Sequence, residues 1–68
     1  MKSISGKEFA KLLEKKNWKL KRITGSHHVH IKSDNPARIS VPIHKNIPLK
    51  IGLLKHLMKI ANIEEKEL

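Results

Sequence analysis

The sequence predicts a small α+β domain in which a helix, three antiparallel strands and a second helix follow one another. Three observations support this prediction. Apolar residues recur with helical spacing near both ends of the chain, they alternate with polar residues across its middle, and short turn sequences separate the alternating stretches. Antiparallel sheets commonly pack one face against helices and leave the other open. We therefore expect both helices to cover the same face of a three-stranded sheet.

The size and composition of the chain set limits on its core. Its 68 residues are enough for one domain, and we expect residues 1–68 to form it. Hydrophobic residues make up 38% of the chain and aromatic residues only 3%, so the core must consist mainly of Ile, Leu and Val. A core this small leaves no room for a deep internal pocket, and any active site should be shallow.

The first helix has several agreeing start signals. Ser5 and Glu8 have the spacing of a capping box, and Ile4 and Phe9 stand where a hydrophobic staple would close. We expect the helix to begin at Ser5 and to end near Asn17, with its apolar stripe packed on the sheet.

The first strand is expected over residues 18–25, with Trp18 and Leu20 on one side. Trp18 could stack on an unpaired base, but its shared parity with Leu20 favours a place in the core. Gly25 and Ser26 then supply a turn.

The second strand, H-H-V-H-I-K-S, carries three of the five histidines of the chain. Its side chains should alternate between the two faces of the sheet. The face toward the core is expected to carry His27, Val29 and Ile31. The open face is expected to carry His28, His30 and Lys32.

The third strand and the second helix follow a turn in the segment D-N-P-A. In R-I-S-V-P-I-H the alternation places Ile39, Val41 and Ile43 inward, and Pro42 favours an edge strand or a strand end. The second helix is expected within residues 45–62, with Pro48 at or just before its first turn. Its predicted core stripe consists of Ile51, Leu54, Leu57, Met58 and Ala61.

The charge balance points to a polyanionic partner. Fifteen Lys and Arg residues against six Asp and Glu residues give a formal net charge of +9, which favours RNA or another nucleic acid. The chain has no cysteine and no apolar run of the length of a signal peptide or a membrane span, which fits a cytoplasmic protein. Binding to an anionic membrane is disfavoured because the lysines are spread over helices and strands alike.

Three functions are open for the histidines: a metal site, a solvated strand surface, or catalysis. A metal site is disfavoured, because neighbouring histidines on a strand point to opposite faces and no cysteine or carboxylate stands close by. We expect no metal and no cofactor. For His28 and His30 we favour a solvated face that helps to bind phosphate, beside Lys32 and Arg38.

His27 is the candidate catalytic residue. Its parity places it at the rim of the core face, next to the Gly25-Ser26 turn, where partial burial would favour the neutral imidazole. A neutral imidazole can remove the proton of a ribose 2′-hydroxyl, after which that oxygen attacks the adjacent phosphorus. Basic side chains would bind the phosphates; the candidates are Lys21, Arg22, Lys45 and Lys50.

Two other functions compete with cleavage. A non-catalytic RNA-binding module would carry the same charge and use the histidines only as surface residues. An interaction protein would use its basic face mainly for an acidic partner.

The sequence resembles a known family. The pattern W-K-L-K-R-I-T-G-S-H-H-V-H, followed by S-V-P-I-H and by the segment G-L-L-K-H-L-M-K-I-A-N-I, is similar to the HicA toxins, small ribonucleases of toxin-antitoxin pairs. The similarity extends from about Ser5 to Ile63, and its most specific elements are G-S-H and V-P-x-H.

This resemblance implies an α-β-β-β-α fold like that of double-stranded RNA-binding domains and metal-independent cleavage of mRNA. It also implies inhibition by a HicB-like antitoxin, in a complex that can be oligomeric. The catalytic histidine of the family corresponds to His27, with His28 in reserve, and the turn residues correspond to Gly25 and Ser26. The family usually has Gly-Thr at the start of the last helix, where this chain has Gly52-Leu53.

Overall fold

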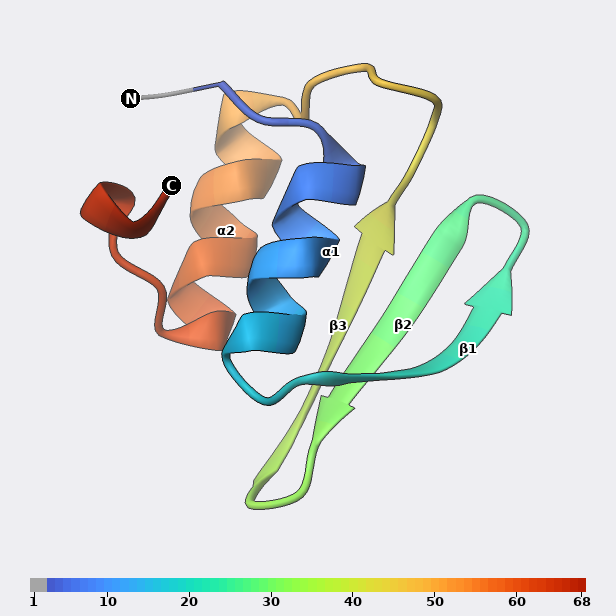
Figure 1. Ribbon diagram of the computed structural model, residues 1–68, viewed down its shortest axis with the longest axis vertical. Coiled ribbons are helices and arrows are strands. Elements are labelled where there is room, and N and C mark those ends of the chain that lie inside the picture. The colour runs from blue at the N-terminus through green and yellow to red at the C-terminus, as the bar shows by residue number, and fades with distance from the viewer. Residues whose placement is uncertain (1–2) are drawn as a thin grey trace.

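The computed structural model describes residues 3–68 and shows the predicted order of elements (Figure 1). A short 3-10 helix, η1, follows the second helix. The elements are α1 (Gly6–Lys15), β1 (Lys19–Thr24), β2 (His27–Lys32), β3 (Asn35–Pro42), α2 (Ile51–Ala61) and η1 (Glu65–Glu67).

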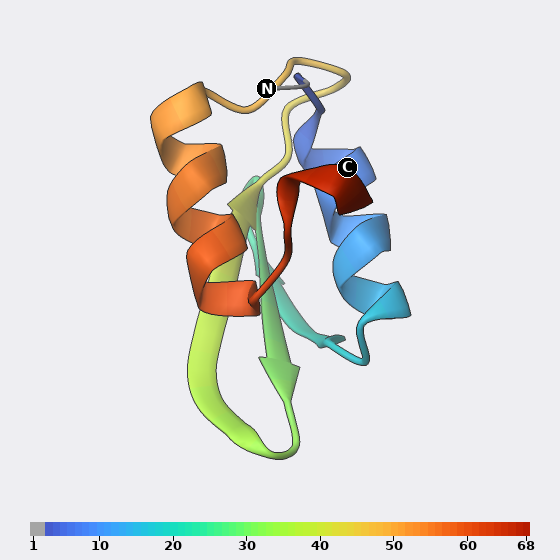
Figure 2. The ribbon, with the colours of Figure 1, turned by 90° about the vertical axis from the view of Figure 1, so that its left-hand side faces the viewer.

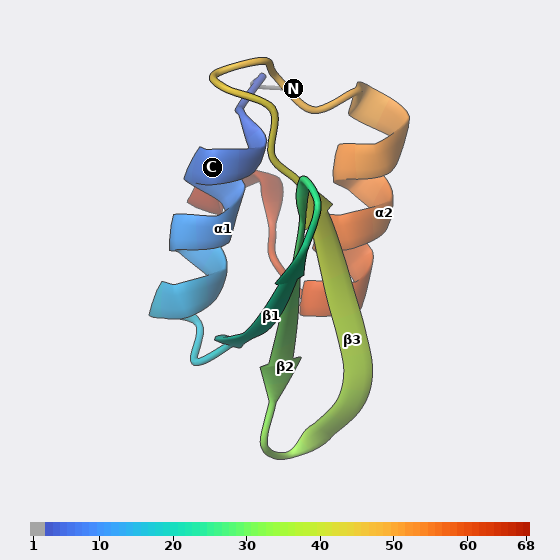
Figure 3. The ribbon, with the colours of Figure 1, turned by 90° about the vertical axis from the view of Figure 1, so that its right-hand side faces the viewer.

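The domain has two layers. The sheet has the order β1-β2-β3 with antiparallel neighbours, so β1 and β3 are its edge strands. Figure 3 looks onto the sheet, with α1 and α2 behind it on either side. Figure 2 shows the opposite side, where the C-terminal segment crosses between the two helices. The predicted α-β-β-β-α fold is confirmed, and it is consistent with that of double-stranded RNA-binding domains.

None of the helices described within residues 3–68 combines the length and the apolar character needed to cross a membrane.

The core lies between the helices and β3. Ile39 and Val41 of β3 are fully buried against apolar residues of both helices, and Trp18 is buried just before β1. The inward placement of these three side chains is therefore confirmed. The helical residues that bury their side chains in this cluster include Phe9, Leu13, Leu54, Leu57 and Met58.

The capping box predicted for α1 is present. The Ser5 hydroxyl accepts a hydrogen bond of 3.2 Å from the Glu8 amide, and the Glu8 Oε1 accepts one of 3.0 Å from the Ser5 amide. These bonds satisfy two of the amide groups that a helix start leaves without a partner in the helix. Ser5 is the N-cap residue, and the helix ends at Lys15, two residues before Asn17.

β1 is more exposed than the sequence indicates. Leu20 was expected inside with Trp18, but 44% of its surface is exposed, and every residue of β1 is exposed. The cause is the place of the strand, because β1 is an edge and its ladder with β2 shifts register between Leu20 and Arg22. A bulge of this kind bends a strand and increases its twist. In Figure 1 the strand curls away from α1.

The predicted faces of β2 are wrong. His30, expected on the open face, has only 1% of its surface exposed, and His28 is half-buried. The two residues pair with Ile39 and Val41 respectively. Residues directly opposite each other in a sheet share a face, so the buried residues of β3 bring His28 and His30 to the helix side. His27, Val29 and Ile31 consequently face away from the helices.

His30 fits the core as a neutral ring. Its Nδ1 lies 3.2 Å from the carbonyl oxygen of His28, which can only accept, so Nδ1 carries the hydrogen. Burial lowers the pKa of His30 from its ordinary 6.5, an effect that this hydrogen bond and the charge of Glu14 oppose in part.

The turn before β3 is tighter than expected. β3 already begins at Asn35, so the turn comprises residues 33–34 instead of the segment D-N-P-A. The Asn35 side chain accepts a hydrogen bond of 2.9 Å from the Ala37 amide, which fixes the strand start. Pro42 is the last residue of this edge strand, as predicted.

In α2, four of the five predicted stripe residues are buried, and Ile51 is the exception with 43% of its surface exposed. Ile51 is the first residue of the helix, and burial starts one turn later, at Leu54. The helix ends at Ala61, and the C-cap residue Asn62 has the left-handed conformation that asparagine often adopts at a helix end. The tail then returns to α1 through an ion pair of 2.9 Å between Lys16 and Glu67.

Gly6, the first residue of α1, touches the end of β3. A Cβ atom at this position would collide with the backbone carbonyl oxygen of Pro42. Backbone atoms on both sides make this contact, so no side-chain rotation can relieve it.

We therefore predict that Gly6→Ala lowers the free energy of unfolding by about 1 to 3 kcal/mol, as overpacking usually does. Urea unfolding measures the change. The matched control is Gly52→Ala in α2, where an added Cβ meets nothing within 4 Å and should stabilise the helix by up to about 1 kcal/mol. Equal stability of Gly6→Ala and the wild type would contradict the predicted collision.

The buried imidazole predicts loss of stability in acid. Because the pKa of His30 is lower in the folded than in the unfolded state, the unfolded chain binds more protons as the pH falls below about 6.5. The free energy of unfolding should then fall by up to about 1.4 kcal/mol per pH unit, until the folded-state pKa is passed. We predict that His30→Leu removes this slope between pH 7 and 5.5, measured by urea unfolding. His56→Gln, at an exposed position of α2, should keep it.

Candidate active site

The hairpin turn between β1 and β2 fixes the start of the site. Thr24 pairs with His27, so Gly25 and Ser26 form a two-residue turn. Gly25 has a φ of 59°, and Ser26 is not among the residues with positive φ, as in a type II′ turn with glycine first. The tight turn sets the orientation of the first residue of β2.

His27 is that first residue, and its side chain is exposed. It lies between Thr24 of β1 and Pro42 of β3, on the face of the sheet away from the helices. The sequence placed it instead at the rim of the core face with partial burial, and this placement is wrong. In the structure, solvent can reach the ring.

The end of β3 brings a further histidine to the same turn. The Ser26 Oγ lies 3.1 Å from the Nε2 of His44, and the Ile43 amide donates a hydrogen bond of 2.7 Å to the Ser26 carbonyl oxygen. His44 is not among the site residues that the sequence predicts. The V-P-x-H motif, which ends at His44, was the only sign of this residue in the sequence. The pairing of β2 with β3 is what brings His44 to the G-S-H segment.

A shallow pocket of about 200 Å³ lies beside His44, in the loop between β3 and α2. Lys50, one of the predicted phosphate-binding residues, is among the residues that line it. Lys45, another, lies in the same loop with a left-handed φ of 52°, which is uncommon for lysine. The pocket is lined by Pro42, His44, Ile47, Pro48, Leu49, Lys50 and Leu53.

The surface of the sheet away from the helices, here called the open face, carries three basic residues on its edge strands, Arg22 and Lys19 on β1 and Arg38 on β3. Its central column on β2 begins with exposed His27 and continues with half-buried Val29 and Ile31. Basic residues flank this column on both edge strands. From the turn downward, the three rows across the strands are Thr24, His27 and Pro42; Arg22, Val29 and Ser40; and Lys19, Ile31 and Arg38.

The other predicted site residues divide between this face and the rest of the molecule. Arg22 and Arg38 lie on the open face, and Lys21 is exposed at the bulge of β1. Lys32 is half-buried at the end of β2. His28, the reserve catalytic candidate, lies half-buried on the helix side, and His30 lies in the core, where RNA cannot reach it.

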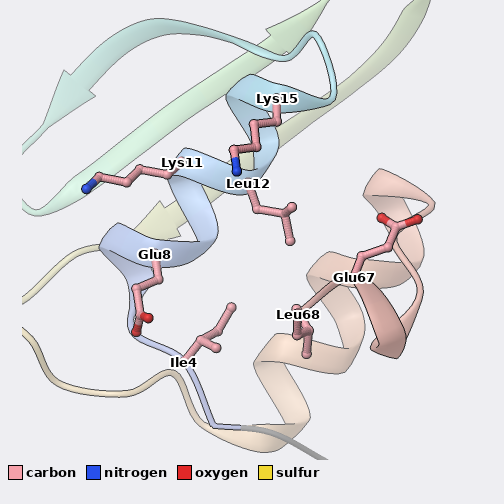
Figure 4. Close-up of a pocket in the computed structure, with 7 residues that line it drawn as sticks. All are labelled: Ile4, Glu8, Lys11, Leu12, Lys15, Glu67 and Leu68. Carbon is pink, nitrogen blue, oxygen red and sulfur yellow. The ribbon is translucent and has the colours of Figure 1, made fainter.

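Another pocket, of about 240 Å³, lies away from this site (Figure 4). It opens between α1 and the C-terminal segment, on the helix side of the molecule. None of the described residues that line it is a predicted site residue. They are Ile4, Glu8, Lys11, Leu12, Lys15, Glu67 and Leu68.

Within residues 3–68, no three His, Asp or Glu side chains come together in a group that could hold a metal ion. The candidate site described above contains the imidazoles of His27 and His44 and the hydroxyl of Ser26, with lysines and arginines nearby.

Comparison with known proteins identifies the family of the chain. A search of curated proteins finds no match. A family profile described as the HicA toxin of bacterial toxin-antitoxin systems matches residues 6–63. The match covers α1, the whole sheet and α2, and it includes both G-S-H and V-P-x-H. The chain therefore belongs to the HicA toxin family.

Proposed function

We propose that this protein is an endoribonuclease that cleaves mRNA without a metal ion, with His27 as the general base and a HicB-like antitoxin as its inhibitor. One observation carries the proposal: an exposed imidazole stands at the end of a face that basic residues flank on both sides.

The chemistry requires a base, cations and access, and the site offers all three. His27 is open to solvent, so a ribose 2′-hydroxyl can approach it. Arg22 and Arg38, on the two edge strands of the open face, can bind phosphates of an RNA strand that lies across this face. Lys50 lines the pocket beside His44, where a cation can stabilise the charge that develops at phosphorus.

The structure favours His27 over His28 as the base. The His28 side chain is half-buried on the helix side, and its carbonyl oxygen is engaged by His30. A base in that position would have to reach RNA past the edge of the helices.

We predict that His27→Ala loses RNA cleavage by about 10²- to 10⁴-fold, the usual contribution of a general base. The assay follows cleavage of an mRNA in the presence of EDTA. The variant should unfold at the wild-type temperature, because the replaced side chain is exposed. His56→Ala, at an exposed position of α2, is the matched control and should cut like the wild type.

Three results would argue against this assignment. Cleavage by His27→Ala at the wild-type rate would exclude His27 as the base. Loss of cleavage in a stable His28→Ala variant alone would move the role to His28. Tight RNA binding by the wild type without any cleavage would favour the non-catalytic RNA-binding module.

The open face predicts a measurable salt effect. Each phosphate contact that is lost makes the dependence of log K on log salt concentration shallower, by about 0.7 for single strands. We predict this change for Arg22→Ala, measured by binding of RNA to an inactive His27→Ala background at several salt concentrations. Lys59→Ala removes the same charge from an exposed position of α2 and should leave the slope almost unchanged. Equal slopes for both variants would place the RNA elsewhere.

A further inference from the structure

We propose that His44 is a second catalytic residue, the general acid that protonates the leaving 5′-oxygen, and that Ser26 orients its ring. This proposal rests on the proposed ribonuclease function. Its basis is the 3.1 Å contact between the Ser26 Oγ and the His44 Nε2 at the end of the sheet that carries His27.

Metal-free RNA cleavage needs two proton transfers. The base removes the proton of the 2′-hydroxyl, and O2′ forms a bond to phosphorus as the bond from phosphorus to O5′ breaks. The electron pair of the broken bond goes to O5′, which must gain a proton to leave readily. The products are a 2′,3′-cyclic phosphate and a free 5′-hydroxyl. With His27 as the base, the proton for O5′ must come from another group.

The placement of His44 fits that second role. Ser26 precedes His27 in the chain and contacts His44 across the end of the sheet. His27 pairs with Pro42, two residues before His44. The two histidines therefore belong to the same end of the sheet.

The serine hydroxyl suits an acid that changes its protonation state. The protonated ring carries a hydrogen on both nitrogens, and a ring that gives up its Nδ1 proton keeps the hydrogen on Nε2, so the serine oxygen can accept from Nε2 before and after the transfer. Ser26 can thus hold the Nε2 of His44 before and after the ring loses a proton. The other ring nitrogen, Nδ1, is then the atom that can face the substrate.

Exposure separates His44 from a purely structural histidine. The structural histidine of this protein, His30, is buried and bonded to a backbone carbonyl oxygen. His44 is exposed and lines the pocket of about 200 Å³ together with Lys50. Part of an RNA strand could enter this hollow and meet both groups.

The test uses a substrate whose leaving group needs no proton. The cut position is first mapped with the wild type, and an RNA is then made with sulfur in place of the bridging 5′-oxygen at that position. A thiolate leaves without protonation, so the general acid becomes dispensable. On ordinary RNA we expect His44→Ala to lose about 10²- to 10⁴-fold in rate. On the sulfur substrate it should recover most of this loss, whereas His27→Ala should stay slow.

Two further variants separate catalysis from structure. His44→Gln can keep a hydrogen bond to Ser26 but cannot transfer a proton, so it should behave like His44→Ala on both substrates. Ser26→Ala should show a smaller defect that the sulfur substrate also relieves, and Ser26→Thr, which keeps the hydroxyl, should restore the rate. His56→Ala should match the wild type on both RNAs.

The outcomes distinguish the two proposals. If His44→Gln cuts ordinary RNA at the wild-type rate, or if the sulfur substrate fails to relieve its defect, His44 is not the acid. In that case a slow His27→Ala would still support the ribonuclease. A wild type that cuts neither substrate would overturn both proposals.

Discussion

The pairing of β2 with β3 is the constraint on which the core and the site both depend. Val41 and Ile39 are buried under the helices, and their partners on β2 must share that face. His28 and His30 are therefore turned toward the helices and His27 toward solvent. Because side chains alternate along a strand, a slip of one residue would exchange the faces and turn His27 inward. The same register keeps the core closed and the candidate base accessible.

Contacts from other elements hold the end of the sheet that carries the site. Gly6 of α1 approaches the carbonyl oxygen of Pro42 so closely that no side chain fits between them. The Leu49 amide donates a hydrogen bond of 2.8 Å to the Ile4 carbonyl oxygen, which ties the loop after β3 to the segment before α1. The loop with His44 is thus fixed between the hairpin turn and the start of a helix. A site built this way needs no deep cavity, which suits a chain of 68 residues.

Signals between residues close in the sequence predicted most of the fold. The errors concern features that depend on pairing between residues far apart in the sequence. The capping box of Ser5 and Glu8 involves residues three positions apart, and the alternation in β3 is complete within one strand. Both could be predicted from the sequence. The faces of β2 could not, because two aliphatic residues, Val29 and Ile31, suggested the wrong inner side and only the partners on β3 decide it. The contact between Ser26 and His44 spans 18 positions and has no local signal.

The open face also restricts what can cover it. Its cations lie on the two edge strands, and a half-buried apolar column lies between them. RNA can match the cations with its phosphates, but a partner protein would have to present carboxylates at two edges and apolar side chains in the middle. Charge pairs at such a rim mainly raise association rates and select the partner, whereas desolvation of the apolar centre supplies affinity. An inhibitor that covers His27 from this side would occupy the proposed RNA contacts at Arg22 and Arg38. Its apolar contacts with Val29 and Ile31 would depend less on the salt concentration than ionic contacts with phosphates do.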